Sequence, residues 1–128
     1  MKSQISLKEK NISTEALNDL IIDSIQDIKG EKIVKLDLRE LDESPTDFFI
    51  ICEANSNTQV GAIAGNIQKR LKLEVNVHAS HVEGTQNALW VCLDYFTTVV
   101  HVFYKETREF YQLDALWNDA KKTEYDDL

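Results

Sequence analysis

The chain has 128 residues, of which 43% are hydrophobic and 28% are charged, as is typical of one soluble globular domain. Its formal net charge of −8 argues against general nucleic-acid binding, which takes much of its affinity from Lys and Arg at phosphates, and favours a basic protein partner. No apolar run approaches the ~18–20 residues of a membrane span, and the first residues do not form a secretory signal, so we expect a cytoplasmic protein without membrane contact.

The first part of the chain predicts an arm, a helix and a strand. Residues 1–12 are polar and show no pattern, so we expect a flexible arm. Ser13 is a suitable N-cap for a helix whose apolar residues recur at helical spacing, and Gly30 supplies its stop. A strand is then expected over residues 32–38.

The middle of the chain predicts a strand, a helix and another strand. Residues 47–52 form an almost continuous apolar run, which is typical of a strand covered on both faces. Ser56 and Gln59 have the spacing of a capping box at the start of a helix that ends in basic residues. With a further strand expected over residues 74–79, this unit predicts a right-handed parallel crossover.

Two antiparallel strands, over residues 89–94 and 98–104, and a helix from about Thr107 complete the predicted elements. The charged residues 121–128 are expected to form a frayed tail. We therefore predict one α/β domain over residues 13–120, in which helices pack against a mixed sheet of about five strands.

Two features of the predicted strand pair could belong to a partner surface. Trp90 shares a strand face with Cys92 and Asp94, and it could be a core residue or an interface hot spot. Asp94 could cap the following turn, or it could be a rim acid beside two exposed aromatic residues, Tyr95 and Phe96. The residues alone leave both pairs of alternatives open.

The sequence predicts no catalytic, metal or cofactor site. Ser56, Asp94 and His101 lack the nucleophile turn that a catalytic triad requires, and His101 is better explained as a hydrogen-bonded inner residue. His78 and His81 would point to opposite faces of a strand and have no further ligand cluster. The helix start at Ser56 has neither a glycine-rich loop nor a phosphate-binding lysine, so ordinary capping explains it.

Several short motifs follow one another between Ala16 and Trp117 in a specific order. They are Leu36-Asp37-Leu38, Asp47-Phe48-Phe49-Ile50-Ile51, Ser56 through Ile63, Glu83-Gly84, Trp90 to Asp94, Val100-His101-Val102-Phe103, Arg108, and Tyr111-Gln112-Leu113-Asp114-Ala115-Leu116-Trp117. This ordered series resembles the ribosome silencing factor family, also called Iojap-related. The resemblance implies a nucleotidyltransferase-like topology without the catalytic motifs, since the paired acids that would hold magnesium are not found at the predicted strand ends. We therefore expect that the protein is not an enzyme.

The resemblance further implies a partner and a mode of action. It implies binding to the fourteenth protein of the large ribosomal subunit, at the face that meets the small subunit, so that joining is blocked and translation is repressed when nutrients are limiting. It assigns partner contacts to Trp90, Asp94, Tyr95, Arg108 and Tyr111, and the exposed hairpin tip adds Phe96.

One position departs from the family pattern. Family members commonly have a Gly followed by an acid where this chain has Phe96 and Thr97, and the loss of the Gly changes the turn types available. The hairpin tip is therefore expected either to have a different shape or to bury more apolar area on its partner.

Three alternatives to the silencing function stay open. Mitochondrial and plastid relatives suggest a large-subunit assembly factor, and an open sheet edge with an aromatic tip would suit a homodimeric scaffold. A nucleotidyltransferase-like enzyme using Asp37, Asp47 or Asp94 is the third.

Overall fold

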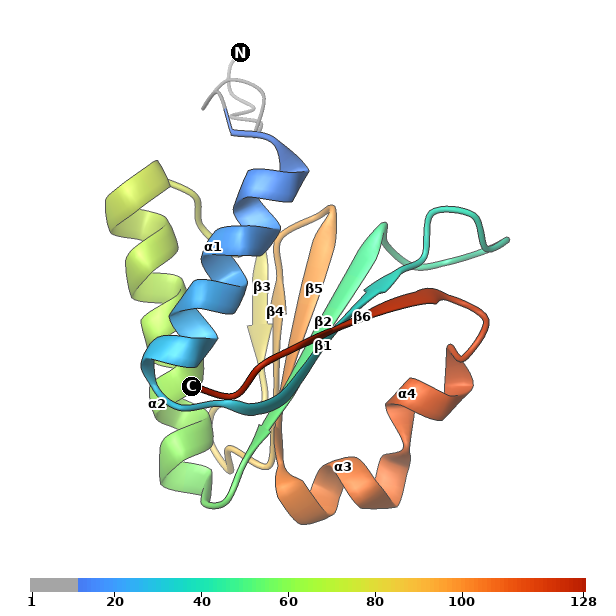
Figure 1. Cartoon of the computed structure of the whole chain (residues 1–128). Helices are drawn as coiled ribbons and strands as arrows, with labels where there is room; N and C mark the ends of the chain where they lie inside the picture. Colours follow the sequence, from blue (N-terminus) through green and yellow to red (C-terminus); the bar gives the residue numbers. More distant parts are fainter. Residues whose placement is uncertain (1–11) are drawn as a thin grey trace.

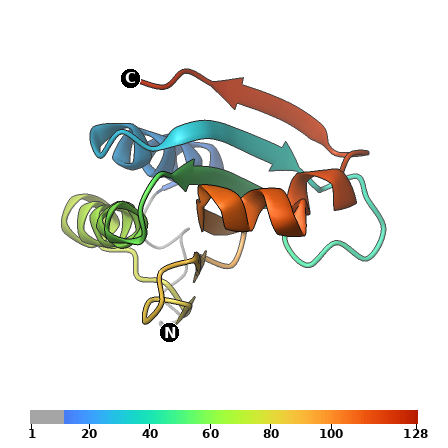
Figure 2. The ribbon, with the colours of Figure 1, turned by 90° about the horizontal axis from the view of Figure 1, so that it is seen from below.

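The computed structural model describes residues 12–128, which form a mixed six-stranded sheet with helices on both faces (Figures 1 and 2). The strand order is β3-β4-β5-β2-β1-β6. In chain order the elements are α1 Thr14–Asp27, β1 Glu31–Asp37, β2 Phe48–Ala54, α2 Asn57–Arg70, a π-helical turn Leu71–Val75, β3 His81–Glu83, β4 Trp90–Asp94, β5 Thr98–Tyr104, α3 Lys105–Tyr111, α4 Leu113–Leu116 and β6 Lys121–Tyr125. The predicted flexible arm over residues 1–12 lies outside the described residues, except for Ile12.

The predicted α/β class and mixed sheet are confirmed, with six strands in place of about five. Strand β2 is buried along its whole length, as its apolar run predicts, and it lies at the centre beside β5. These two strands are parallel, whereas the other neighbouring pairs are antiparallel. Helices α1 and α2 cover one face of the sheet, while α3 and α4 lie on the other, so the sheet separates two apolar cores (Figure 2).

The strand predicted over residues 74–79 is wrong. The chain stays helical through a π-helical turn to Val75, where Arg70 Nε donates to Glu74 Oε2 at 2.6 Å, and Asn76 reverses it in the left-handed region at φ 56°. Val77 then turns into the core without pairing in the sheet. The predicted crossover into 74–79 is therefore also wrong, because the parallel neighbour of β2 is β5.

Both long helices begin where the sequence predicts. Ser13 Oγ accepts a hydrogen bond from the Ala16 N–H at 3.0 Å, and Ser56 Oγ accepts one from the Gln59 N–H at 3.1 Å. The side chain of Gln59 does not complete a capping box. Its Nε2 donates instead to the carbonyl of Ile28 at 3.0 Å, and this bond ties the start of α2 to the end of α1.

Gly30, which the sequence predicts as the stop of α1, follows the last residues of that helix. Lys29, and not Gly30, occupies the left-handed region at φ 63°. The Gly30 N–H donates to the Ile25 carbonyl at 3.0 Å, which closes a Schellman-type helix end. A Cβ at position 30 would collide with Cγ2 of Ile25, so glycine is required there by close packing.

The frayed tail predicted over residues 121–128 is wrong for most of its length. Residues 121–125 form β6, which pairs antiparallel with β1 and crosses in front of the sheet in Figure 1. Tyr125 packs against the core beneath α1, and the Lys32 N–H donates to Asp127 Oδ1 at 2.9 Å. An edge strand pairs through its backbone on one side only, and charged side chains are common on such strands. The charged and exposed residues of β6 therefore did not indicate a strand in the sequence.

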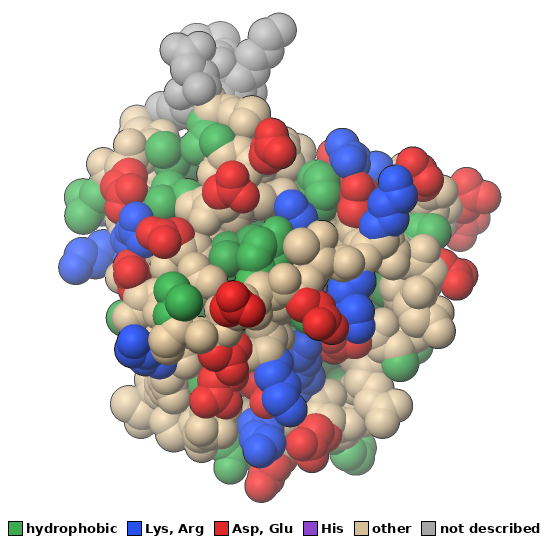
Figure 3. All heavy atoms as spheres, viewed as in Figure 1, with side chains coloured by type: hydrophobic (Ala, Val, Ile, Leu, Met, Phe, Trp, Pro, Cys, Tyr) green, Lys and Arg blue, Asp and Glu red, His purple; other side chains and the backbone are tan. Residues whose placement is uncertain are grey.

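The surface over α1, β1 and β6 carries acidic and basic side chains interspersed with one another (Figure 3). Within residues 12–128, no helix combines the length and the apolar character that crossing a membrane would require.

Candidate partner-binding surface

The last predicted helix is divided in two, and the division shapes one face of the molecule. Gln112, at φ 51°, ends α3 and begins α4. Leu113 is buried against the sheet, whereas Phe110 and Leu116 are 79% and 74% exposed. Two apolar side chains of the segment predicted as one helix therefore face solvent.

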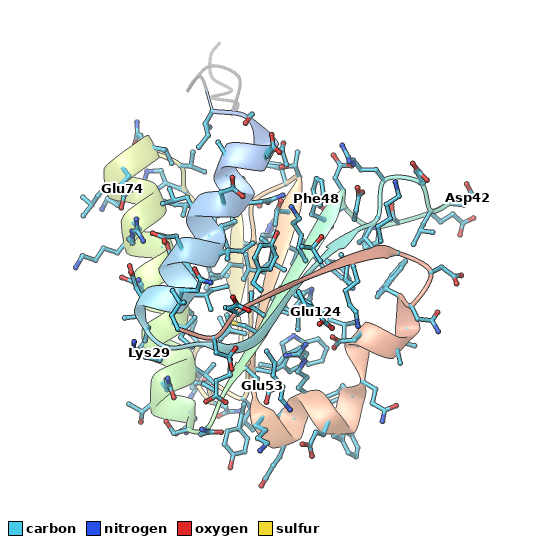
Figure 4. All side chains as sticks on the ribbon, in the orientation of Figure 1. Lys29, Asp42, Phe48, Glu53, Glu74 and Glu124 are labelled. Carbon is cyan, nitrogen blue, oxygen red and sulfur yellow. The ribbon has the colours of Figure 1, made fainter. Side chains whose placement is uncertain are left out.

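Arg108 fastens α3 to the sheet and to α4. Its guanidinium donates to the Lys32 carbonyl at 2.8 Å, to Glu53 Oε1 at 3.2 Å and to Asp114 Oδ2 at 2.8 Å. Glu53 of β2 is only 4% exposed and lies close to α3 in Figure 4. Burial raises the pKa of Asp114, but the hydrogen bond and charge of Arg108 outweigh it and hold that pKa below its usual value. The predicted partner residue Arg108 is thus engaged within the protein.

Trp90 forms part of the core and part of the surface at once. Its indole stacks on Phe103 with 4.8 Å between ring centroids, and the ring of Tyr111 lies 5.0 Å away. Its Nε1 donates to Nδ1 of His101 at 3.0 Å. The Trp90 side chain remains half-buried. Phe103 and His101 hold the inner side of the indole, and its outer edge faces solvent.

A groove of about 820 Å³ lies along this outer edge, and we call it the Trp90 groove. It is bordered by α3 on one side and by the turn before β4 on the other, and its apolar lining is Leu89, Trp90, Tyr104, Phe110 and Tyr111. Glu106 is the charged residue among those that line it. Gly84 shapes the turn, because at φ 87° its backbone lies against the Trp90 carbonyl, where a Cβ would collide.

The same sheet face continues from the groove toward the hairpin tip, defined here as residues 95–97. A shallow hollow of about 340 Å³ is lined by Cys92 and Asp94 of β4, with His81, Glu83 and Val99 beside them. Asp94 Oδ1 accepts a hydrogen bond from the Phe96 N–H at 2.8 Å, so it caps the turn while it lies on this face. Within residues 12–128, no three or more His, Cys, Asp or Glu side chains are grouped as metal ligands.

The two aromatic residues of the hairpin tip have opposite environments. Phe96 is 75% exposed, as predicted, whereas Tyr95 is 1% exposed and packs in the core beneath α1 and α2. The predicted exposure of Tyr95 is therefore wrong, and burial raises the pKa of its hydroxyl to about 12. The signal was available in the sequence, since Tyr95 follows Val91 and Leu93 at the two-residue period of a buried strand face.

His101 is a buried, hydrogen-bonded residue, as predicted. It is 7% exposed, and its ring meets the edge of Phe49 at 4.5 Å between centroids. Because Nδ1 accepts from Trp90, the neutral ring carries its proton on Nε2. Burial lowers the pKa of His101 to about 4, although Asp114 opposes this shift. Protonation would place a second N–H against the indole N–H and break the bond that orients Trp90.

Acid is therefore expected to destabilise this surface through His101. An unfolded histidine takes up its proton near pH 6.5 and the folded one near pH 4, so stability falls as the pH falls between these values. The full loss corresponds to roughly 3 kcal/mol. Urea unfolding of the wild type and His101→Asn at pH 7 and pH 4.5 would measure most of this loss, since asparagine can accept from Trp90 without titrating. Equal losses in the two proteins would contradict the prediction, and His78→Gln, at an exposed histidine, is the control.

Comparison with known proteins extends over nearly the whole chain. Residues 11–128 match the family model described as "Ribosomal silencing factor during starvation". The chain is 37% identical over 113 residues to the ribosomal silencing factor of Halalkalibacterium halodurans, covering 88% of this chain and 95% of the relative. It is similar to the crystal structure of a Chromobacterium violaceum protein, with a TM-score of 0.79, 34% identity, and coverage of 84% and 88% of the two chains. A mouse protein named for mitochondrial assembly of the ribosomal large subunit is 32% identical over 75 residues, which is 56% of this chain and 32% of that protein.

Proposed function

This chain belongs to the ribosomal silencing factor family, and on that premise we propose that it binds the large ribosomal subunit and blocks joining of the small subunit. We propose the fourteenth protein of the large subunit, at the intersubunit face, as its partner in the cytoplasm. Repression of translation under nutrient limitation then follows from steric exclusion alone. The family match over residues 11–128 is the observation that carries this proposal.

The Trp90 groove has the character that such a contact requires. Trp and Tyr are enriched among interface hot spots, and here Trp90 and Tyr111 stand side by side on a rigid sheet and helix. Among residues 12–128, no Lys or Arg lines the groove, and the net charge of the chain is −8. This balance suits a basic protein surface better than RNA phosphates.

We propose that the protein acts by occupancy, without catalysis. His101, the buried titratable group beside the groove, is neutral at pH 7, and its Nδ1 is already engaged by Trp90. It therefore has no free basic nitrogen to offer a substrate in the groove.

Two other roles would use the same surface. The name of the mouse relative supports a role in large-subunit assembly, which needs the same binding but a different consequence. A second copy of the chain could also cover the exposed apolar residues of the groove, and such a homodimer would compete with the ribosome.

Sedimentation of purified ribosomal subunits with and without the protein tests the proposal. We expect the protein to migrate with the large subunit alone and to lower the fraction of joined ribosomes in proportion to its concentration. Absence of migration with the large subunit would overturn the proposal. Migration that leaves joining unchanged would favour the assembly role.

A further inference from the structure

Phe96 at the hairpin tip combines two properties that folding stability alone does not favour. Its φ of 70° lies in the left-handed region, which bulky side chains rarely adopt because Cβ approaches the backbone. Its ring is nevertheless 75% exposed, so burial within the chain does not compensate for the strain. Strained backbone of this kind concentrates where a protein binds something.

The strained tip is also held firmly. The Phe96 N–H donates to Asp94 Oδ1 at 2.8 Å, and its carbonyl accepts from Thr46 Oγ1 at 2.6 Å. The Thr97 carbonyl accepts from the Phe48 N–H at 3.0 Å, which joins the tip to the start of β2. The backbone that presents the ring is therefore preorganised, and little conformational entropy of the backbone remains to be lost on binding.

The charges beside the tip indicate what kind of surface would receive the ring. The loop between β1 and β2, residues 38–47, supplies Thr46 and carries four acidic residues against one basic residue, Arg39. Arg39 is already paired with Asp37 at 2.7 Å, so the acids over positions 40–47 dominate the charge of the loop. Figure 1 shows this loop and the hairpin tip at the same end of the sheet, and Figure 4 places Asp42 at the outer end of the loop. Acids in this position repel nucleic-acid phosphates and attract a basic protein surface.

We propose that Phe96 is an aromatic anchor that inserts into an apolar socket on a basic protein surface, flanked by cations that face residues 40–47. This inference rests on the proposed function and adds a second contact to it. Trp90 begins β4 and Phe96 lies two residues beyond its end, and the strand alone puts about 14 Å between Trp90 and Asp94. One ribosomal protein surface of ordinary interface size can span both contacts.

The test separates the anchor from a merely structural turn, because the two roles predict opposite changes in stability. Phe96→Gly removes the strain and is expected to raise Tm by roughly 2–5 °C. It also removes the ring, so affinity for purified large subunits is expected to fall by about thirtyfold or more, as at a hot spot. Phe96→Tyr, which keeps the ring, should retain binding within a few-fold. Leu73→Ser removes an exposed apolar side chain from the π-helical turn and should leave binding unchanged.

The possible failures are distinguishable. If the wild type binds and Phe96→Gly binds equally well, or if Phe96→Gly lowers Tm, the anchor is overturned while the proposed function stands. If the wild type does not bind large subunits at all, the proposed function fails and the anchor fails with it. Binding of the wild type to deproteinised large-subunit RNA, with the same dependence on Phe96, would overturn the protein socket and assign the ring to RNA.

Discussion

Replacing Arg108 with methionine is expected to lower the free energy of unfolding by about 3–5 kcal/mol, because it leaves the buried carboxylate of Glu53 without its cation. The side chains of Arg108 and Glu53 are 11% and 5% exposed, so water replaces little of the lost interaction. The substitution also leaves the Lys32 carbonyl and Asp114 without their donor. Chemical unfolding monitored by far-UV circular dichroism would measure the loss.

Two further variants show whether burial is the cause. Arg70→Met breaks ion pairs to Asp23, Asp27 and Glu74, all of which are about half-exposed, and a much smaller loss is expected there. Arg108→Met combined with Glu53→Leu removes both members of the buried pair and should recover much of the stability, since an apolar pair can replace buried charges at little cost. A loss in Arg108→Met no larger than that in Arg70→Met would contradict the explanation.

The Arg108 network also illustrates what the sequence could not supply. The resemblance to the family marks Arg108 as important and assigns it to the partner surface, whereas the structure directs its guanidinium inward. Its partners Lys32, Glu53 and Asp114 come from β1, β2 and the start of α4, and no local pattern indicates that these segments meet. Sequence spacing reports which face of an element a residue occupies, but contacts between distant elements depend on the topology.

Elements with a strong local cause were predicted well. The buried run of β2, the caps at Ser13 and Ser56, and the alternation in β4 each follow from a side-chain pattern within a few residues. The failures have non-local causes. Strand β6 exists because β1 offers it a backbone edge. The chain stays helical to Val75, where Arg70 pairs with Asp23 and Asp27 of α1, and Val77 is then buried in the core outside the sheet.

The candidate surface was predicted in part for the same reason. Strand alternation placed Trp90, Cys92 and Asp94 on one face, and the structure shows that face open beside α3. The choice between core and surface for Trp90 could not be made from the sequence, because the side chain is partly buried and partly exposed: its stacking on Phe103 and its bond to His101 depend on β5. The left-handed conformation of Phe96 could not be predicted from this sequence alone, because Phe rarely adopts it; the one signal was the glycine that family members commonly have at this position.

Trp90→Ala is expected to weaken binding to large subunits by about thirtyfold to a thousandfold, which corresponds to roughly 2–4 kcal/mol at a hot spot. The same change removes the ring that stacks on Phe103 and the donor to His101, so a loss of stability is expected alongside the loss of binding. Alanine at this position therefore does not by itself distinguish a contact with the partner from a weakened fold.

Two other substitutions separate the loss of binding from the loss of stability, because Trp90→Phe keeps the stacking on Phe103 and Tyr111→Ala leaves Trp90 unchanged. Trp90→Phe keeps an aromatic ring on Phe103 but gives up the N–H, whereas Tyr111→Ala removes the half-exposed ring beside Trp90 at the end of α3. If the groove is the contact, Tyr111→Ala should keep a Tm close to that of the wild type and bind large subunits at least tenfold more weakly. A tenfold loss corresponds to about 1.4 kcal/mol of binding free energy, as expected for an interface residue that contributes to affinity. Co-sedimentation at several protein concentrations, paired with a thermal melt of each variant, gives both quantities. Wild-type affinity in both variants, with weak binding in Trp90→Ala alone, would place Trp90 in the core and move the partner surface away from the groove.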